Sequence, residues 1–173
     1  MSVFSAESDF DAEVLYQQLL TQLRAAWSGL GERVQLVGIA SGGVWVAQRL
    51  RDDLGLSGEV GVVSSSMHRD DFAQRGLAAS AMQTQLPFEV DGATVVLVDD
   101  VLHTGRTLRA VINELFDYGR PARVALAVLV DRGEHQLPVA ADWCAQHSAL
   151  SGDMVLSLSR DEQGRFAFQV EAA

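Results

Sequence analysis

Four short apolar runs constrain the fold of this chain more than any other feature. They are VQLVGIA at 34–40, EVGVVSS at 59–65, TVVLV at 94–98 and RVALAVLV at 123–130. Continuously apolar runs of this length are typical of strands buried on both faces of a parallel sheet, whose crossovers are usually helices. The sequence therefore predicts an α/β fold with three layers, in which helices flank a mainly parallel central sheet. With 173 residues, the chain fits a single domain over residues 1–173.

Helical patterns lie between these runs. Apolar residues recur every three or four positions from Phe10 to Trp27, and Ser8 with Asp11 resembles a capping arrangement at the start. A second helix is predicted over residues 44–53. A third is predicted over 105–118, where Gly119 marks its end.

Two regions depart from the strand–helix alternation. Residues 66–93 are polar or small and show no clear period, which favours a flexible arm or lid. Residues 150–173 contain two alternating segments on either side of DEQG, and this pattern predicts a C-terminal hairpin.

The charge balance and the single cysteine restrict the class of protein. The net charge is −10, and all 13 basic residues are arginines. This balance argues against a protein whose main role is to wrap nucleic acid. Cys144 is the only cysteine, so no internal disulfide can form, and neither a signal-peptide pattern nor a membrane-spanning run of about 20 apolar residues is present. We expect a cytoplasmic protein that is not embedded in a membrane.

Polar clusters follow each of the four apolar runs. They occupy residues 41–43, 64–69, 99–107 and 131–133. Because ligands of parallel α/β sheets bind at the carboxyl ends of the strands, we expect these clusters to form one site.

The segment HTGRT at 103–107 carries the most informative chemistry. A glycine turn that leads into a helix presents backbone N–H groups and the positive end of the helix dipole, which suits one phosphate group. The adjacent acids Asp99 and Asp100 could accept hydrogen bonds from a ribose diol beside that phosphate. The segment at 103–107 is also compatible with an ordinary helix N-cap that contains a turn glycine. Asp99 and Asp100 are also compatible with a strand end at which one carboxylate caps and the other is solvated.

The run VVLVDDVLHTGRTL at 95–108 resembles the 5-phosphoribosyl-1-pyrophosphate (PRPP) signature of type I phosphoribosyltransferases. With LVGIASGG, HRDD and the downstream GRPARVALAVLVDRGEHQLPVAAD, the chain resembles the PyrR family over about residues 8–142. Members of that family regulate the pyrimidine operon and act as uracil phosphoribosyltransferases.

The resemblance implies a role for each cluster. Contacts to PRPP or the nucleotide would come from Asp99, Asp100, Val101, Leu102, His103, Thr104, Gly105, Arg106 and Thr107. A pyrophosphate loop, which holds a non-proline cis peptide in related enzymes, would be formed by Ala40, Ser41, Gly42 and Gly43. The mobile arm would supply Arg69 for catalysis, and the base would be bound by Val130, Asp131 and Arg132.

The implied reaction makes UMP and pyrophosphate from uracil and PRPP. Mg²⁺ would arrive bound to PRPP, so no metal site on the protein is expected, and the family implies a homodimer or homotetramer. The alternatives are a UMP- or PRPP-sensing regulator that binds mRNA, and a purine phosphoribosyltransferase.

The sequence departs from the PyrR pattern in three places. Ser41-Gly42-Gly43 replaces the usual Thr-Arg-Gly, and Glu134 replaces the histidine of Arg-Gly-His, with His135 one position later. The stretch at 146–151 lacks the basic residue that the family carries there.

Overall fold

The computed structural model describes residues 10–65 and 82–173. In chain order its elements are α1 (Ala12–Ala26), the 3-10 helix η2 (Trp27–Leu30), β1 (Val34–Ile39), α2 (Gly42–Asp53), β2 (Gly61–Val63), β3 (Thr94–Leu102), α4 (Arg106–Asp117), β4 (Arg123–Asp131), β5 (Trp143–His147), β6 (Met154–Arg160) and β7 (Phe166–Ala172). Within these residues, no helix is both long and apolar enough to cross a membrane.

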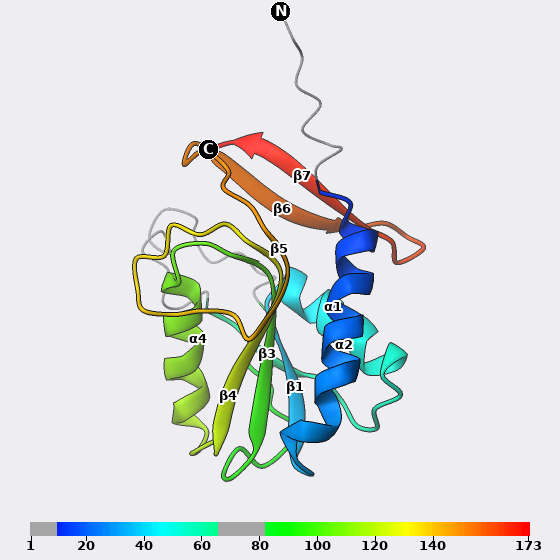
Figure 1. Cartoon of the computed structure of the whole chain (residues 1–173). Helices are drawn as coiled ribbons and strands as arrows, with labels where there is room; N and C mark the ends of the chain where they lie inside the picture. Colours follow the sequence, from blue (N-terminus) through cyan, green and yellow to red (C-terminus); the bar gives the residue numbers. More distant parts are fainter. Residues whose placement is uncertain (1–9, 66–81) are drawn as a thin grey trace, which may run out of the picture.

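Five strands form a parallel sheet in the order β2-β1-β3-β4-β5. Helices α1 and α2 cover one face and α4 covers the other, as Figure 1 shows. Side chains of β3 alternate between the layers: Val96 and Val98 pack toward α1 and α2, whereas Val95 and Leu97 pack toward α4. The predicted three-layer α/β fold is confirmed.

Three element boundaries differ from the sequence prediction. Asp11 caps α1, because its Oδ1 accepts the N–H groups of Glu13 and Val14 at 3.0 and 3.1 Å, and Ser8 lies outside the described residues. Strand β3 continues past Val98 to Leu102, so the two acids lie within the strand. The sequence pattern missed β5, because this edge strand is only partly buried and lacks an apolar run.

The region predicted to form a mobile arm is divided. Residues 66–81 lie outside the described part of the chain. Residues 82–93 pack on the sheet instead: Gln85 forms a bridge with Val62, Phe88 packs against the core on the α4 side, and Val90 is buried. This second half is therefore part of the folded domain.

The C-terminal hairpin β6–β7 is held to the helices by an arginine that lies between one carboxylate and two aromatic rings. The Arg49 guanidinium donates to both oxygens of Glu13 at 2.8 Å and lies 4.1 Å above the Tyr16 ring and 5.1 Å from that of Phe166. Glu13 also accepts the backbone N–H of Phe166 at 2.7 Å. The hydrogen bond from Arg49 lowers the pKa of Glu13, although partial burial opposes this effect. Glu13 therefore joins α1, α2 and β7.

We expect Glu13→Gln to lower the free energy of unfolding by about 1–2 kcal/mol at neutral pH, the scale of a lost charge-assisted hydrogen bond. The pKa of Glu13 is lower in the folded state, so its charge stabilises the fold above the unfolded-state pKa, and this contribution is lost as pH falls through the folded-state pKa. Urea denaturation at several pH values should show the difference between wild type and variant shrinking in acid. Glu162→Gln, on the exposed hairpin turn, is the control and should match wild type. A difference that does not vary with pH would contradict the assigned role of the charge.

Candidate active site

The turn between β3 and α4 forms a concave loop over a small cavity. Gly105 caps α4 with φ +90°, a left-handed conformation that favours glycine, and the first amides of α4 point out of the helix. The cavity has a volume of about 190 Å³ and is lined by Asp99, Thr104, Gly105 and Thr107 among others. Because ligand pockets usually measure about 300–1,000 Å³, this cavity suits one group of a substrate, such as a phosphate.

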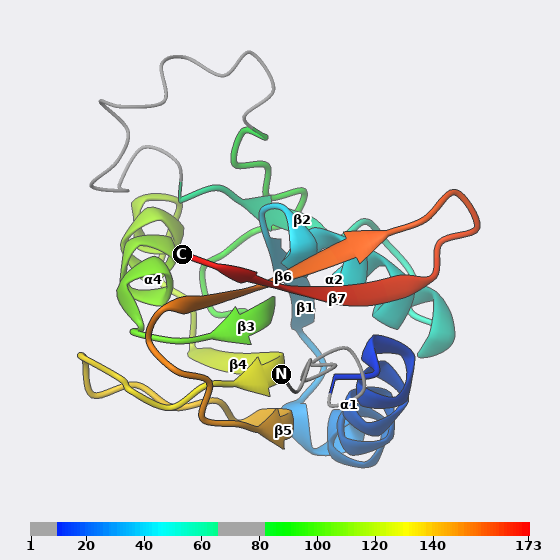
Figure 2. The same cartoon turned by 90° about the horizontal axis from the view of Figure 1, so that it is seen from above.

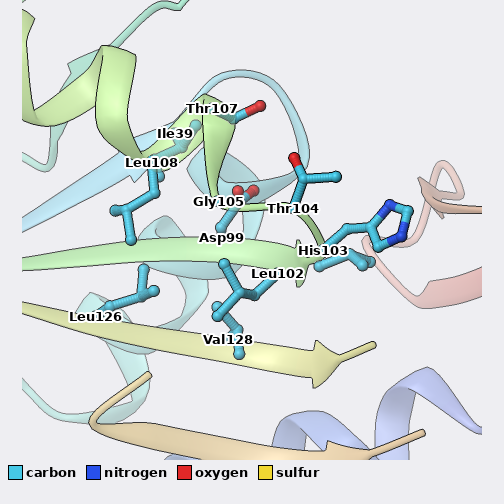
Figure 3. A pocket seen from close by; sticks show the side chains of 11 residues that line it. Ile39, Asp99, Leu102, His103, Thr104, Gly105, Thr107, Leu108, Leu126 and Val128 are labelled. Carbon is cyan, nitrogen blue, oxygen red and sulfur yellow. The ribbon is translucent and has the colours of Figure 1, made fainter. Parts of the chain in front are cut away.

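Figure 3 shows how the polar side chains are arranged around this cavity. The Asp99 carboxylate and the hydroxyl groups of Thr104 and Thr107 lie on the same side of β3, and the His103 ring points away from them. The Arg106 N–H donates to Thr104 Oγ1 at 3.3 Å, which fixes the start of the helix. The turn can therefore offer hydroxyl and amide donors to one anionic group.

The two neighbouring acids leave β3 on opposite faces of the sheet. Asp99 lines the cavity on the α4 side, whereas Asp100 lies against the start of α2, where a Cβ added to Gly42 would lie 2.6 Å from Asp100 Oδ2. The backbone also shields the two charges from each other, because Asp99 Oδ1 accepts the N–H of Asp100 and Asp100 Oδ1 accepts that of Val101. The strand pleat thus gives each carboxylate its own environment.

The predicted pyrophosphate loop lies beside Asp100. The Ala40–Ser41 peptide bond is cis, and Ser41 is exposed at the start of α2. A Cβ on Gly43 would collide with the carbonyl oxygen of Val98. The two glycines therefore allow the first turn of α2 to approach β3 closely, and backbone N–H groups stand where the usual family pattern has an arginine.

The predicted base-binding residues are largely buried. Val130 is inside the sheet, and Asp131 turns its carboxylate back onto its own loop. Asp131 Oδ1 accepts the N–H of Gly133 at 2.8 Å and lies 2.8 Å from His135 Nε2. Left-handed backbone at Gly133 and Glu134, with φ of +69° and +53°, brings His135 back to this carboxylate. The shift of the histidine by one position in the sequence is thus compatible with a contact to Asp131.

Arg132 is also buried, with only 5% of its surface exposed. One of its terminal nitrogens donates to the carbonyl of Ser151 at 3.2 Å, and its Nε has no hydrogen-bond partner within the described part of the chain. Its side chain therefore joins the loop that follows β4 to the segment that precedes β6.

The predicted phosphate loop (residues 102–107) and the predicted base loop (residues 130–136) are tied together by four contacts. Two are backbone hydrogen bonds, from Arg132 N–H to Leu102 O at 2.8 Å and from Gln136 N–H to Thr104 O at 2.9 Å. Two involve side chains: Arg106 Nε donates to Gln136 Oε1 at 2.9 Å, and His103 Nε2 lies 3.1 Å from Glu134 Oε2. The sequence did not predict these contacts of Gln136 and Glu134, since no spacing rule links residues about 30 positions apart.

One predicted residue, Arg69, lies outside the described residues. The other predicted clusters meet at the carboxyl ends of β1, β3 and β4, as the topology requires. No group of three or more potential metal-ligating side chains occurs within residues 10–65 and 82–173.

Comparison with known proteins decides the family. The model of the phosphoribosyl transferase domain matches residues 15–150. A protein of Ralstonia nicotianae called Bifunctional protein PyrR is 54% identical over 165 residues, which cover 93% of this chain and 94% of the relative. The chain belongs to the PyrR family of phosphoribosyltransferases. A second PyrR relative, from Pseudomonas aeruginosa, is 46% identical over 86% of this chain and 84% of its own length.

Solved structures support the fold of this PyrR-family chain. An alanine mutant from a study of an invariant aspartic acid in HPRTs matches with a TM-score of 0.61 and 19% identity, covering 84% of this chain and 81% of that one. A purine phosphoribosyltransferase from Pyrococcus horikoshii matches with a TM-score of 0.56 and 22% identity, covering 78% and 83%. At these identities the match extends to the fold alone.

We expect Gly42→Ala to reduce the affinity for PRPP at least about tenfold, because the new methyl group would displace the Asp100 carboxylate or the first turn of α2. Isothermal titration calorimetry with PRPP provides the measurement. Gly29→Ala is the matched control, since a Cβ there meets nothing within 4 Å. Equal affinities in the two variants would show that the close approach of α2 to Asp100 is not needed for binding.

Proposed function

We propose that this chain transfers the phosphoribosyl group of PRPP to uracil, producing UMP and pyrophosphate. The observation that carries the proposal is the phosphate loop at the start of α4, placed beside acids on β3 and a glycine turn on α2, in a chain of the PyrR family.

The chain's own residues suggest how PRPP would be oriented. Its 5-phosphate would bind the hydroxyls of Thr104 and Thr107 and the first amides of α4. Its ribose would lie over the carboxyl end of β3, where Asp99 and Asp100 could accept hydrogen bonds from the hydroxyl groups. Its pyrophosphate would face the N-terminal amides of α2 at Gly42 and Gly43.

The reaction then follows from charge. The bond between ribose C1 and the pyrophosphate oxygen breaks with its electron pair on the oxygen. A ring nitrogen of uracil donates the pair for the new C–N bond, and its proton passes to solvent. Positive charge develops on the ribose, and the carboxylates at the end of β3 would stabilise it.

A magnesium ion carried by PRPP would find carboxylate oxygen, the ligand that Mg²⁺ prefers, at Asp100 beside the first turn of α2, where Gly42 has no side chain. When bound, the ion would neutralise charge on the leaving pyrophosphate.

Uracil should be the preferred acceptor when nucleotide formation from PRPP is assayed with uracil, hypoxanthine and guanine in parallel. We expect UMP formation at a kcat/KM at least about tenfold above that for either purine, since a factor of ten needs only about 1.4 kcal/mol of discrimination. Omitting PRPP provides the blank. Turnover of a purine without turnover of uracil would overturn the proposal and support the purine alternative.

Asp100→Asn should lower kcat at least about tenfold, because the charge that faces the ribose and the pyrophosphate loop is removed. The amide oxygen can still accept the N–H of Val101, so we expect the thermal unfolding midpoint to stay within a few degrees of wild type. Asp117→Asn, at the exposed end of α4, is the control and should retain full activity. Loss of folding without a kinetic defect in the folded fraction would assign Asp100 a structural role.

Four properties stay predictions from the sequence: the lid function of Arg69, a homodimer or homotetramer, the cytoplasmic location and mRNA binding. For mRNA binding, the net charge of −10 is unfavourable, because affinity for nucleic acid depends strongly on basic contacts to phosphates.

A further inference from the structure

A second cleft lies between α2 and the loop that joins β6 to β7. Figures 1 and 2 show this loop extending beside α2, and the cleft between them has a volume of about 470 Å³. Its walls include Trp45, Gln48 and Arg51 on the helix side and Arg160, Gln163 and Arg165 on the hairpin side. It shares no lining residue with the cavity under the phosphate loop.

Arginines are concentrated in this cleft. Four of the 13 arginines of an acidic chain line it, of which Arg49 is neutralised by Glu13 and Arg51 by Asp52 at 2.7 Å. The guanidinium groups of Arg160 and Arg165 form no ion pair within 4.0 Å among the described residues. Both side chains are exposed, so the cleft presents two cationic groups that can bind an anion.

An aromatic surface lies beside these charges. The Arg160 guanidinium lies 5.2 Å from the ring of Trp45, which is half-buried at the base of the hairpin. A tryptophan ring and an arginine plane both provide flat surfaces on which a nucleobase can stack, typically worth about 1–3 kcal/mol per base. The cleft thus combines recognition of an anion with recognition of a planar ring.

From these features we infer that the cleft is a second nucleotide-binding site, separate from the catalytic site. The phosphates bind Arg165, and the base stacks on the outer face of the Arg160 guanidinium, whose other face lies over Trp45. A volume of about 470 Å³ matches a single small ligand. A nucleic-acid strand is disfavoured, because it would need a longer basic track than two unpaired arginines on a chain with net charge −10.

The cleft is also connected to the catalytic site through one helix. Trp45 follows Gly43 by two residues in α2, whose first turn packs against β3 and Asp100. A nucleotide in the cleft would therefore contact the helix that forms the proposed pyrophosphate loop.

The indole N–H signal of Trp45 in ¹H–¹⁵N spectra, assigned with Trp45→Phe, reports on this cleft directly. We expect GTP and UTP each to shift this signal in a saturable way at low salt. Arg165→Gln should weaken the binding about tenfold, the effect of one lost charge-assisted hydrogen bond. Arg120→Gln, an exposed arginine at the other end of the sheet, is the matched control and should bind as wild type does.

Two further probes distinguish the sources of the phosphate. Inorganic pyrophosphate should bind at least tenfold more weakly than the nucleotides, since it has no ring to stack. Equal affinity that is lost in Arg165→Gln would reduce the cleft to a plain anion site and overturn the assignment. Decauridylate RNA that saturates the Trp45 signal at a lower concentration than either nucleotide would overturn it in favour of a nucleic-acid surface. A signal that does not move, or that moves equally in Arg165→Gln, would also overturn it, because ligand at the catalytic site could then explain any shift.

Discussion

The close approach of α2 to the end of β3 is the contact on which the catalytic site depends. It is possible because Gly42 and Gly43 carry no side chain where the helix meets Val98 and Asp100. This approach places the amino end of one helix beside Asp100, while the amino end of α4 lies on the other side of β3 beside Asp99. Two helix dipoles thus point their positive ends at the same strand terminus, a suitable environment for a ligand with two anionic groups.

The pleat of β3 explains why adjacent carboxylates are tolerated there. Successive side chains of a strand point to opposite faces, so Asp99 and Asp100 do not share one pocket. Each carboxylate also accepts a backbone N–H. Repulsion between the two acids is therefore reduced before any substrate binds.

Contacts between loops distant in sequence give the site its rigidity. Gln136 touches the phosphate loop twice, through its N–H to Thr104 and its side chain to Arg106. The Asp131 carboxylate organises its own loop through its contacts with Gly133 and His135. Arg106, which the sequence predicts to contact PRPP, also donates its Nε–H to Gln136.

The sequence by itself determined the layer architecture and the position of the site, because buried strands and amphipathic helices follow from local periodicity, and parallel strands bring their carboxyl ends to one edge. It also determined the glycine turn that leads into α4, because the turn and the helix start are adjacent in the chain. Only the tertiary structure decided that Asp99 and Asp100 face different helices, that residues 82–93 belong to the core, and that Glu134 and Gln136 hold the phosphate loop. The cleft between α2 and the β6–β7 hairpin is likewise visible only in the tertiary structure. These features depend on contacts between residues far apart in sequence, and no local pattern encodes such contacts.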